Sequence, residues 1–102
     1  MDESVLRAST PFAGGIGGGK EDICGALVGG LLAIGLIHGR TDPDVNDDAC
    51  MEMAKDLRSK FLDHFGDTIC GRLRENWVGQ PGQPDCAELA AQAAGLLSEI
   101  LN

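Results

Sequence analysis

The chain has 102 residues, of which 43% are hydrophobic, and its formal net charge is -8. This length suffices for a single domain, residues 1–102, with one buried core. The negative charge and the lack of any block of basic residues argue against binding to nucleic acid or to an anionic membrane. Because the first residues are acidic rather than apolar, we expect no secretory signal and a cytoplasmic protein.

The first third of the chain predicts a short helix, a glycine-rich turn and a long apolar helix. Residues 2–8 can form about two helical turns. Residues 13–20 lack periodicity, and so many glycines are needed only where the backbone turns at positive φ or packs very closely. Asp22 is then expected to cap a helix that runs through Ile37 and ends at Gly39. This helix is apolar on every side and too short to cross a bilayer, which predicts a buried core helix.

Three amphipathic helices are predicted in the remainder. Pro43 and the acids around it are typical of a helix start, and the long helix that follows closes at Gly66. Asp67 is expected to cap a shorter helix, residues 80–84 to form a loop, and Asp85 to open a capping box for the last helix. The predicted core-facing positions are Val45, Ala49, Cys50, Met53, Ala54, Leu57, Phe61, Phe65, Ile69, Cys70, Leu73, Trp77, Cys86, Leu89, Ala90, Ala93, Leu96, Leu97 and Ile100.

No segment alternates between apolar and polar residues as a half-buried strand would. We therefore predict an all-α fold, a small bundle of about four helices around the buried glycine-rich apolar helix. Glycines four residues apart on that helix allow close approach of another backbone, and we also expect a homodimer.

The four cysteines are the main candidates for chemistry. Cys24, Cys70 and Cys86 each follow a predicted capping aspartate, which puts them in a first helical turn. There the helix dipole lowers a thiol pKa and favours a nucleophile or a metal ligand. Cys50 is expected in mid-helix on the apolar stripe. The alternative is that these thiols only pack in the core, and no C-x-x-C motif announces a metal or dithiol site.

Two other features carry weaker signals. Gly14 to Lys20 fits the phosphate-loop pattern G-x-x-x-x-G-K, but Glu21 replaces the hydroxyl residue and no apolar strand precedes the loop. His38 and His64 are candidates for metal ligands or proton donors, although such histidines more often cap or pack helices.

Three sequence features together resemble a known family. They are Gly14-Gly15-x-Gly17, then Cys24-Gly25-Ala26-x-x-Gly29, then Phe65-Gly66 followed by Cys70. From about Leu6 to the C-terminus the chain is similar to the C_GCAxxG_C_C family of putative redox-active proteins. The resemblance implies a small helical protein with four characteristic cysteines that act in redox chemistry or hold a metal or iron–sulfur centre.

The resemblance assigns roles to Cys24, Cys70 and Cys86 as redox thiols or metal ligands. The family's first cysteine, on an N-terminal helix, has no counterpart here. Three explanations follow: Cys50 replaces it, a second subunit supplies it, or the site works with three cysteines or as a dithiol.

The leading hypothesis is a small redox protein. Its cysteines bind an iron–sulfur cluster or another metal, or they cycle between thiol and disulfide with an unidentified redox partner protein. In this hypothesis Cys24 is the reactive or liganding thiolate, and Cys70 and Cys86 are co-ligands or resolving thiols. The alternative is a non-catalytic helical interaction module with a degenerate site, and a phosphate-binding or nucleotide-binding loop ranks third.

Overall fold

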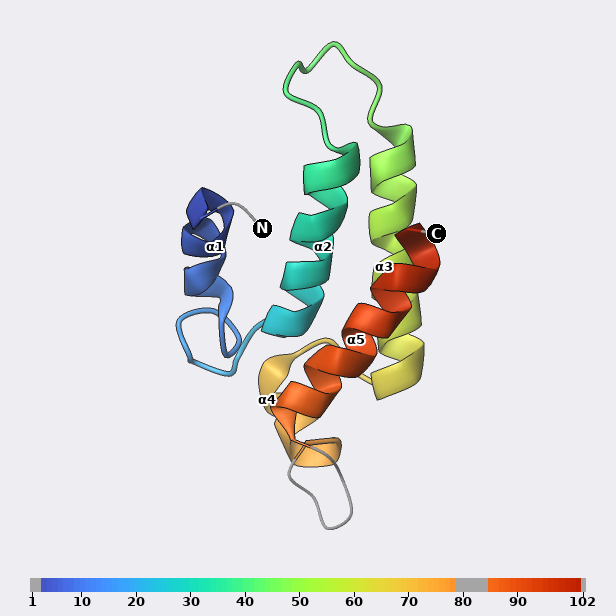
Figure 1. The fold of residues 1–102 in the computed structure, drawn as a ribbon. Coiled ribbons are helices and arrows are strands. Elements are labelled where there is room, and N and C mark those ends of the chain that lie inside the picture. Colours follow the sequence, from blue (N-terminus) through green and yellow to red (C-terminus); the bar gives the residue numbers. More distant parts are fainter. Residues whose placement is uncertain (1–2, 79–84, 102) are drawn as a thin grey trace.

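Residues 3–78 and 85–101 of the computed structural model are described, and they contain five α-helices and one 3-10 helix (Figure 1). The elements are α1 (Glu3–Ser9), η1 (Thr10–Phe12), α2 (Gly25–His38), α3 (Asp48–Phe65), α4 (Cys70–Asn76) and α5 (Cys86–Leu101). The predicted all-α class is confirmed. The described ranges hold no strand, only an isolated antiparallel bridge between Ile23 and Ile69. The loop predicted at residues 80–84 lies outside the described residues.

The apolar helix α2 is central, with α3 and α5 against one side of it and α1 along the other (Figure 1). The α2 and α3 helices run antiparallel, and α4 lies near the end of the bundle where α2 begins. The core is built from the apolar stripes predicted by the helical periodicity. Its largest fully buried side chains are Leu27, Ile34, Leu57, Phe61 and Leu73.

The long helix α3 begins at Asp48, so the prediction of a start near Pro43 is wrong. The physical reason is Arg40, whose Nη1 donates to the carbonyls of Pro43 and Val45, each at 2.7 Å. Its Nη2 also pairs with the Asp47 carboxylate at 3.2 Å. These contacts stabilise the segment before α3 as a loop. Val45 is exposed and is not part of the apolar stripe.

Two of the three predicted capping aspartates lie outside the cap position. Cys24 is the N-cap of α2 and Ile69 is the N-cap of α4. Asp22 accepts from its neighbour Ile23 instead, and Asp67 Oδ1 accepts from the amides of the two residues after it. The cap of α5 is confirmed in part, because the Glu88 amide donates to Asp85 Oδ1 at 3.0 Å.

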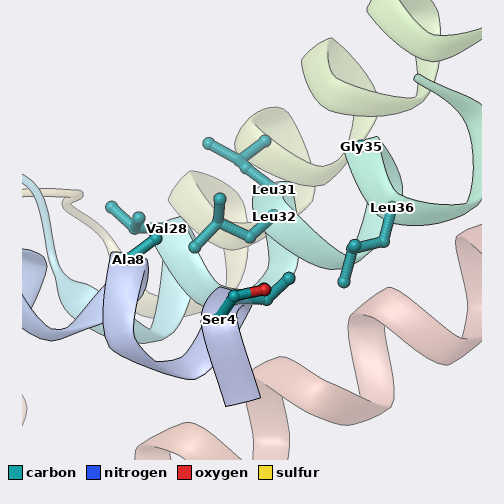
Figure 2. A pocket seen from close by; sticks show the side chains of 8 residues that line it. Ser4, Ala8, Val28, Leu31, Leu32, Gly35 and Leu36 are labelled. Carbon is teal, nitrogen blue, oxygen red and sulfur yellow. The ribbon is translucent and has the colours of Figure 1, made fainter. Parts of the chain in front are cut away.

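The apolar helix is less buried than predicted. Leu36 and Ile37 near its end are 54% and 61% exposed. Figure 2 shows Ser4 and Ala8 of α1 beside α2, where a shallow pocket of about 590 Å³ extends to Leu36. The short α1 is too small to cover α2 fully. Among the described residues, no helix is both long and apolar enough to cross a membrane.

Candidate thiol site

A two-way backbone clamp holds Cys24 and Cys70 together. The Cys24 amide donates to the Thr68 carbonyl at 2.8 Å, and the Cys70 amide donates to the Asp22 carbonyl at 2.8 Å. Each cysteine directly follows one of the bridged residues, so the two side chains leave the clamp on the same side. The bridge thereby joins the start of α2 to the start of α4.

The glycine-rich segment forms a left-handed turn that supports this clamp. Residues 14–18 all have positive φ, and four of these five are glycine. A left-handed backbone costs an ordinary residue about 1–2 kcal/mol, which explains the glycine density. A Cβ placed on Gly15 would lie 2.7 Å from the Cβ of Cys70, so the turn packs directly on that cysteine.

The same turn argues against phosphate binding. The five consecutive amides of residues 16–20 all donate to carbonyls of residues 11–16, with N–O distances of 2.7–3.4 Å. A phosphate-binding loop needs such amides free to meet its ligand. The glycines therefore serve backbone turning and close packing.

Three of the four cysteines line one pocket of about 460 Å³. Cys24 comes from the start of α2, Cys70 from the start of α4 and Cys86 from the start of α5. Cys70 is buried, Cys24 is half-buried and Cys86 is exposed. The other lining residues are Ala13, Gly14, Gly25, Ala26, Leu73, Arg74, Val78, Leu89 and Ala90. The tertiary fold thus gathers thiols that lie up to 62 residues apart, from position 24 to position 86.

Burial raises the pKa of the Cys24 thiol above its usual value of 9.0. The amides of Ala26 and Leu27 favour the thiolate and lower the pKa, but they do not compensate for burial. Negative charge on Cys70 or Cys86 raises the pKa further. The expectation that a helix start would lower the pKa of Cys24 is therefore wrong, because desolvation outweighs the amides and the dipole.

Arg74 is the residue that the sequence interpretation missed. It also lines the pocket, and its Nη1 approaches the Cys86 sulfur at 3.8 Å. Arg74 lies four residues after Cys70 on α4, so both project from one face of the helix. That four-residue spacing was the signal in the sequence that could have pointed to Arg74.

Cys50 lies away from this pocket. Because α3 starts at Asp48, Cys50 falls in its first turn and not in mid-helix as predicted. It packs against the hydrophobic core. The α2 and α3 helices run antiparallel, so the start of α3, which carries Cys50, lies toward the end of α2 opposite Cys24 (Figure 1). The 14 residues of α2 give it a length of about 21 Å.

The two histidines are also away from the thiols. His38 closes α2, and His64 on α3 is 2.8 Å from Gln92 Oε1 of α5. Neither lines the thiol pocket. Within residues 3–78 and 85–101, no three His, Cys, Asp or Glu side chains converge closely enough to hold a metal ion. The sulfurs have the chemistry of soft-metal ligands, and the three cysteines share one pocket.

Comparison with known protein families identifies a family that matches most of the chain. The model of the family described as "Putative redox-active protein (C_GCAxxG_C_C)" matches residues 1–100. Comparison with curated proteins and with solved structures gave no match. The match covers nearly all of the chain, including the glycine turn and the three cysteines of the pocket. The chain therefore belongs to the C_GCAxxG_C_C family of putative redox-active proteins.

Proposed function

We propose that this protein is a small thiol redox protein in which Cys86 meets the substrate and Cys24 completes an intramolecular disulfide. The observation that carries the proposal is that thiols from three separate helix starts line one open pocket. All four cysteines are free in the described structure.

The different exposure of the thiols supports a division of roles. Thiol–disulfide exchange needs a sulfur that the incoming disulfide can reach, and Cys86 is the exposed one. Cys24 is half-buried and lines the same pocket as Cys86. Cys70 is buried beneath the glycine turn and is the least accessible of the three. We therefore assign the first attack on the substrate disulfide to Cys86 and the second, resolving attack to Cys24. These roles are the reverse of those expected from the sequence.

The proposed reaction is a two-electron exchange with a disulfide RSSR. The Cys86 thiolate attacks one sulfur, which forms a mixed disulfide Cys86–S–S–R and releases RS⁻. Cys24 then attacks the Cys86 sulfur, which forms the Cys24–Cys86 disulfide and releases the second RS⁻. The two protons lost by the protein thiols go to the two released thiolates, and a dithiol partner protein reverses the reaction. Because burial raises the pKa of Cys24, the second step is expected to be the slower one.

A test starts from the reduced protein and a small uncharged disulfide such as hydroxyethyl disulfide. Mass spectrometry of trapped peptides should find the Cys24–Cys86 bond in the wild type. Cys24→Ser should accumulate the mixed disulfide at Cys86, and Cys86→Ser should lose most of the reaction. Cys50→Ser is the matched control and should behave as the wild type. Equal oxidation of Cys86→Ser and the wild type would contradict the proposal.

A metal or iron–sulfur centre on the same thiols is the second candidate. Charge on Cys70 and Cys86 raises the pKa of Cys24, and a bound soft cation would relieve that repulsion. The lack of three converging donors among the described residues speaks for the dithiol reaction instead. Iron and zinc analysis after anaerobic purification decides between them. Stoichiometric metal that is lost in Cys24→Ser would favour the metal centre, whereas metal-free protein with slow, ordinary thiols would favour a non-catalytic interaction module.

A further inference from the structure

The thiol pocket has an uneven chemical lining. Its described walls are mostly apolar, and Arg74 is the one basic side chain among the lining residues. The guanidinium is exposed and lies beside Cys86, with Nη1 3.8 Å from the sulfur. A thiol sulfur is a weak hydrogen-bond acceptor, so the Arg74 guanidinium can exchange this contact for a hydrogen bond to a stronger acceptor. The pocket therefore offers a positive charge next to the most accessible thiol.

This local charge has the opposite sign to the charge of the whole chain. The formal net charge is -8, which repels anions at long range. A single exposed guanidinium does not reverse that field, but it favours an anion that has already reached the pocket. A guanidinium matches a carboxylate with two parallel hydrogen bonds, and the apolar walls suit a short methylene chain.

We propose that the pocket selects small organic disulfides that carry a carboxylate, which Arg74 binds while Cys86 attacks the disulfide. The inference rests on the proposed thiol–disulfide function and specifies its substrate class. The short distance between Arg74 and Cys86 suits a carboxylate separated from the disulfide by about two methylene groups, since extended chain atoms advance only a few ångströms. The exchange is the one balanced above, with the carboxylate-bearing disulfide as RSSR.

Three disulfides of nearly equal size test the proposal: dithiodipropionate, which is anionic, hydroxyethyl disulfide, which is uncharged, and cystamine, which is cationic. The rate of Cys86 modification is measured for each by mass spectrometry and divided by the rate with a small free thiol, which corrects for intrinsic reactivity. We expect the corrected rates of the wild type to fall from the anionic to the uncharged to the cationic reagent.

Arg74→Gln should lower the ratio of the corrected rate with dithiodipropionate to that with hydroxyethyl disulfide by about two- to fivefold, the range of an exposed ion pair. Arg58→Gln is the matched control, because it removes the same charge from an exposed position on α3 away from the pocket. Its rates should equal those of the wild type. Added salt should reduce the preference for the anion.

The outcomes separate the two proposals. If the wild type shows no preference for the anionic reagent, or if Arg58→Gln loses as much as Arg74→Gln, the carboxylate selectivity is wrong. Oxidation by the uncharged disulfide would then still support the thiol redox function. If hydroxyethyl disulfide gives no Cys24–Cys86 bond at all, the redox proposal itself fails.

Discussion

Cys24 shows how burial can overcome a favourable helix start. The nearby amides of Ala26 and Leu27 lower the pKa of its thiol, although its side chain makes no capping hydrogen bond. Its location inside the bundle nevertheless raises its pKa, because a thiolate there loses its hydration. Position along a helix is visible in the sequence, whereas desolvation depends on what packs around the helix start.

The raised pKa of Cys24 predicts a pH dependence of stability. The folded state keeps this thiol protonated to a higher pH than the unfolded chain does. The contribution of Cys24 to stability is fully present below the usual pKa of 9.0. It is lost as the pH rises from there through the higher pKa of the folded state, because the unfolded chain releases the proton at a lower pH than the folded chain does. Urea unfolding at neutral and alkaline pH should show this loss.

Cys24→Ala provides the control for that measurement. The part of the alkaline loss that belongs to Cys24 should disappear, while the rest of the loss should remain. An equal alkaline loss in the variant and the wild type would contradict the assignment.

The close packing around Gly15 predicts that one added methyl group there lowers the free energy of unfolding strongly. Its φ is +76°, and a Cβ there would lie 2.7 Å from the Cβ of Cys70. Gly15→Ala should therefore lower the free energy of unfolding by the cost of the left-handed backbone, about 1–2 kcal/mol, and by a further 1–3 kcal/mol, roughly, for overpacking. Gly17→Ala is the matched control, because its φ is +62° but nothing lies within 4 Å. Equal losses in denaturant unfolding would rule out the contact with Cys70.

At the scale of elements, α5 depends on its cap. Asp85 Oδ1 accepts the Glu88 amide at 3.0 Å, directly before the helix that carries Cys86. Asp85→Ala should destabilise the protein by about 1 kcal/mol in thermal or denaturant unfolding. Asp85→Asn keeps the acceptor and should stay close to the wild type. A loss that is the same in both variants would mean that charge, rather than the capping bond, matters.

The other helix starts were predicted less well for one common reason. Backbone pairing outside the helices fixes where α2 and α4 begin, since Cys24 and Cys70 donate across the bridge between Ile23 and Ile69. Arg40 similarly holds the segment before α3 in a loop. These partners are distant or irregular, so the local sequence signals at Asp22 and Pro43 did not reveal them.

At the scale of the whole molecule, the expected homodimer stays a prediction. The α2 helix carries no charged residue, and its side chains at Leu36 and Ile37 remain exposed. Two copies that each carry a net charge of -8 repel each other over most of their surface. The exposed side of α2 can contact the same side of a second copy without bringing like charges together. We therefore expect two chains to pair through the exposed side of α2.

Leu36→Glu should weaken that dimer at least about tenfold, because two like charges would meet in the contact. Light scattering over a range of concentrations measures the change. Leu62→Glu is the control, since Leu62 is an exposed leucine on α3 outside this face. A wild-type chain that is monomeric at high concentration would contradict the prediction.

Local sequence patterns were sufficient to predict the helical class, the ends of α2 and α3, and the three cysteines that line one pocket. Those properties follow from periodicity, from Gly39 and Gly66 as helix ends, and from a motif that is local in the chain. Three features depend on tertiary contacts: Cys50 lies outside the pocket, Cys86 is the exposed thiol of the pocket, and Arg74 lies beside it. Exposure, distance and desolvation arise from contacts between segments far apart in the chain, and no local pattern encodes them.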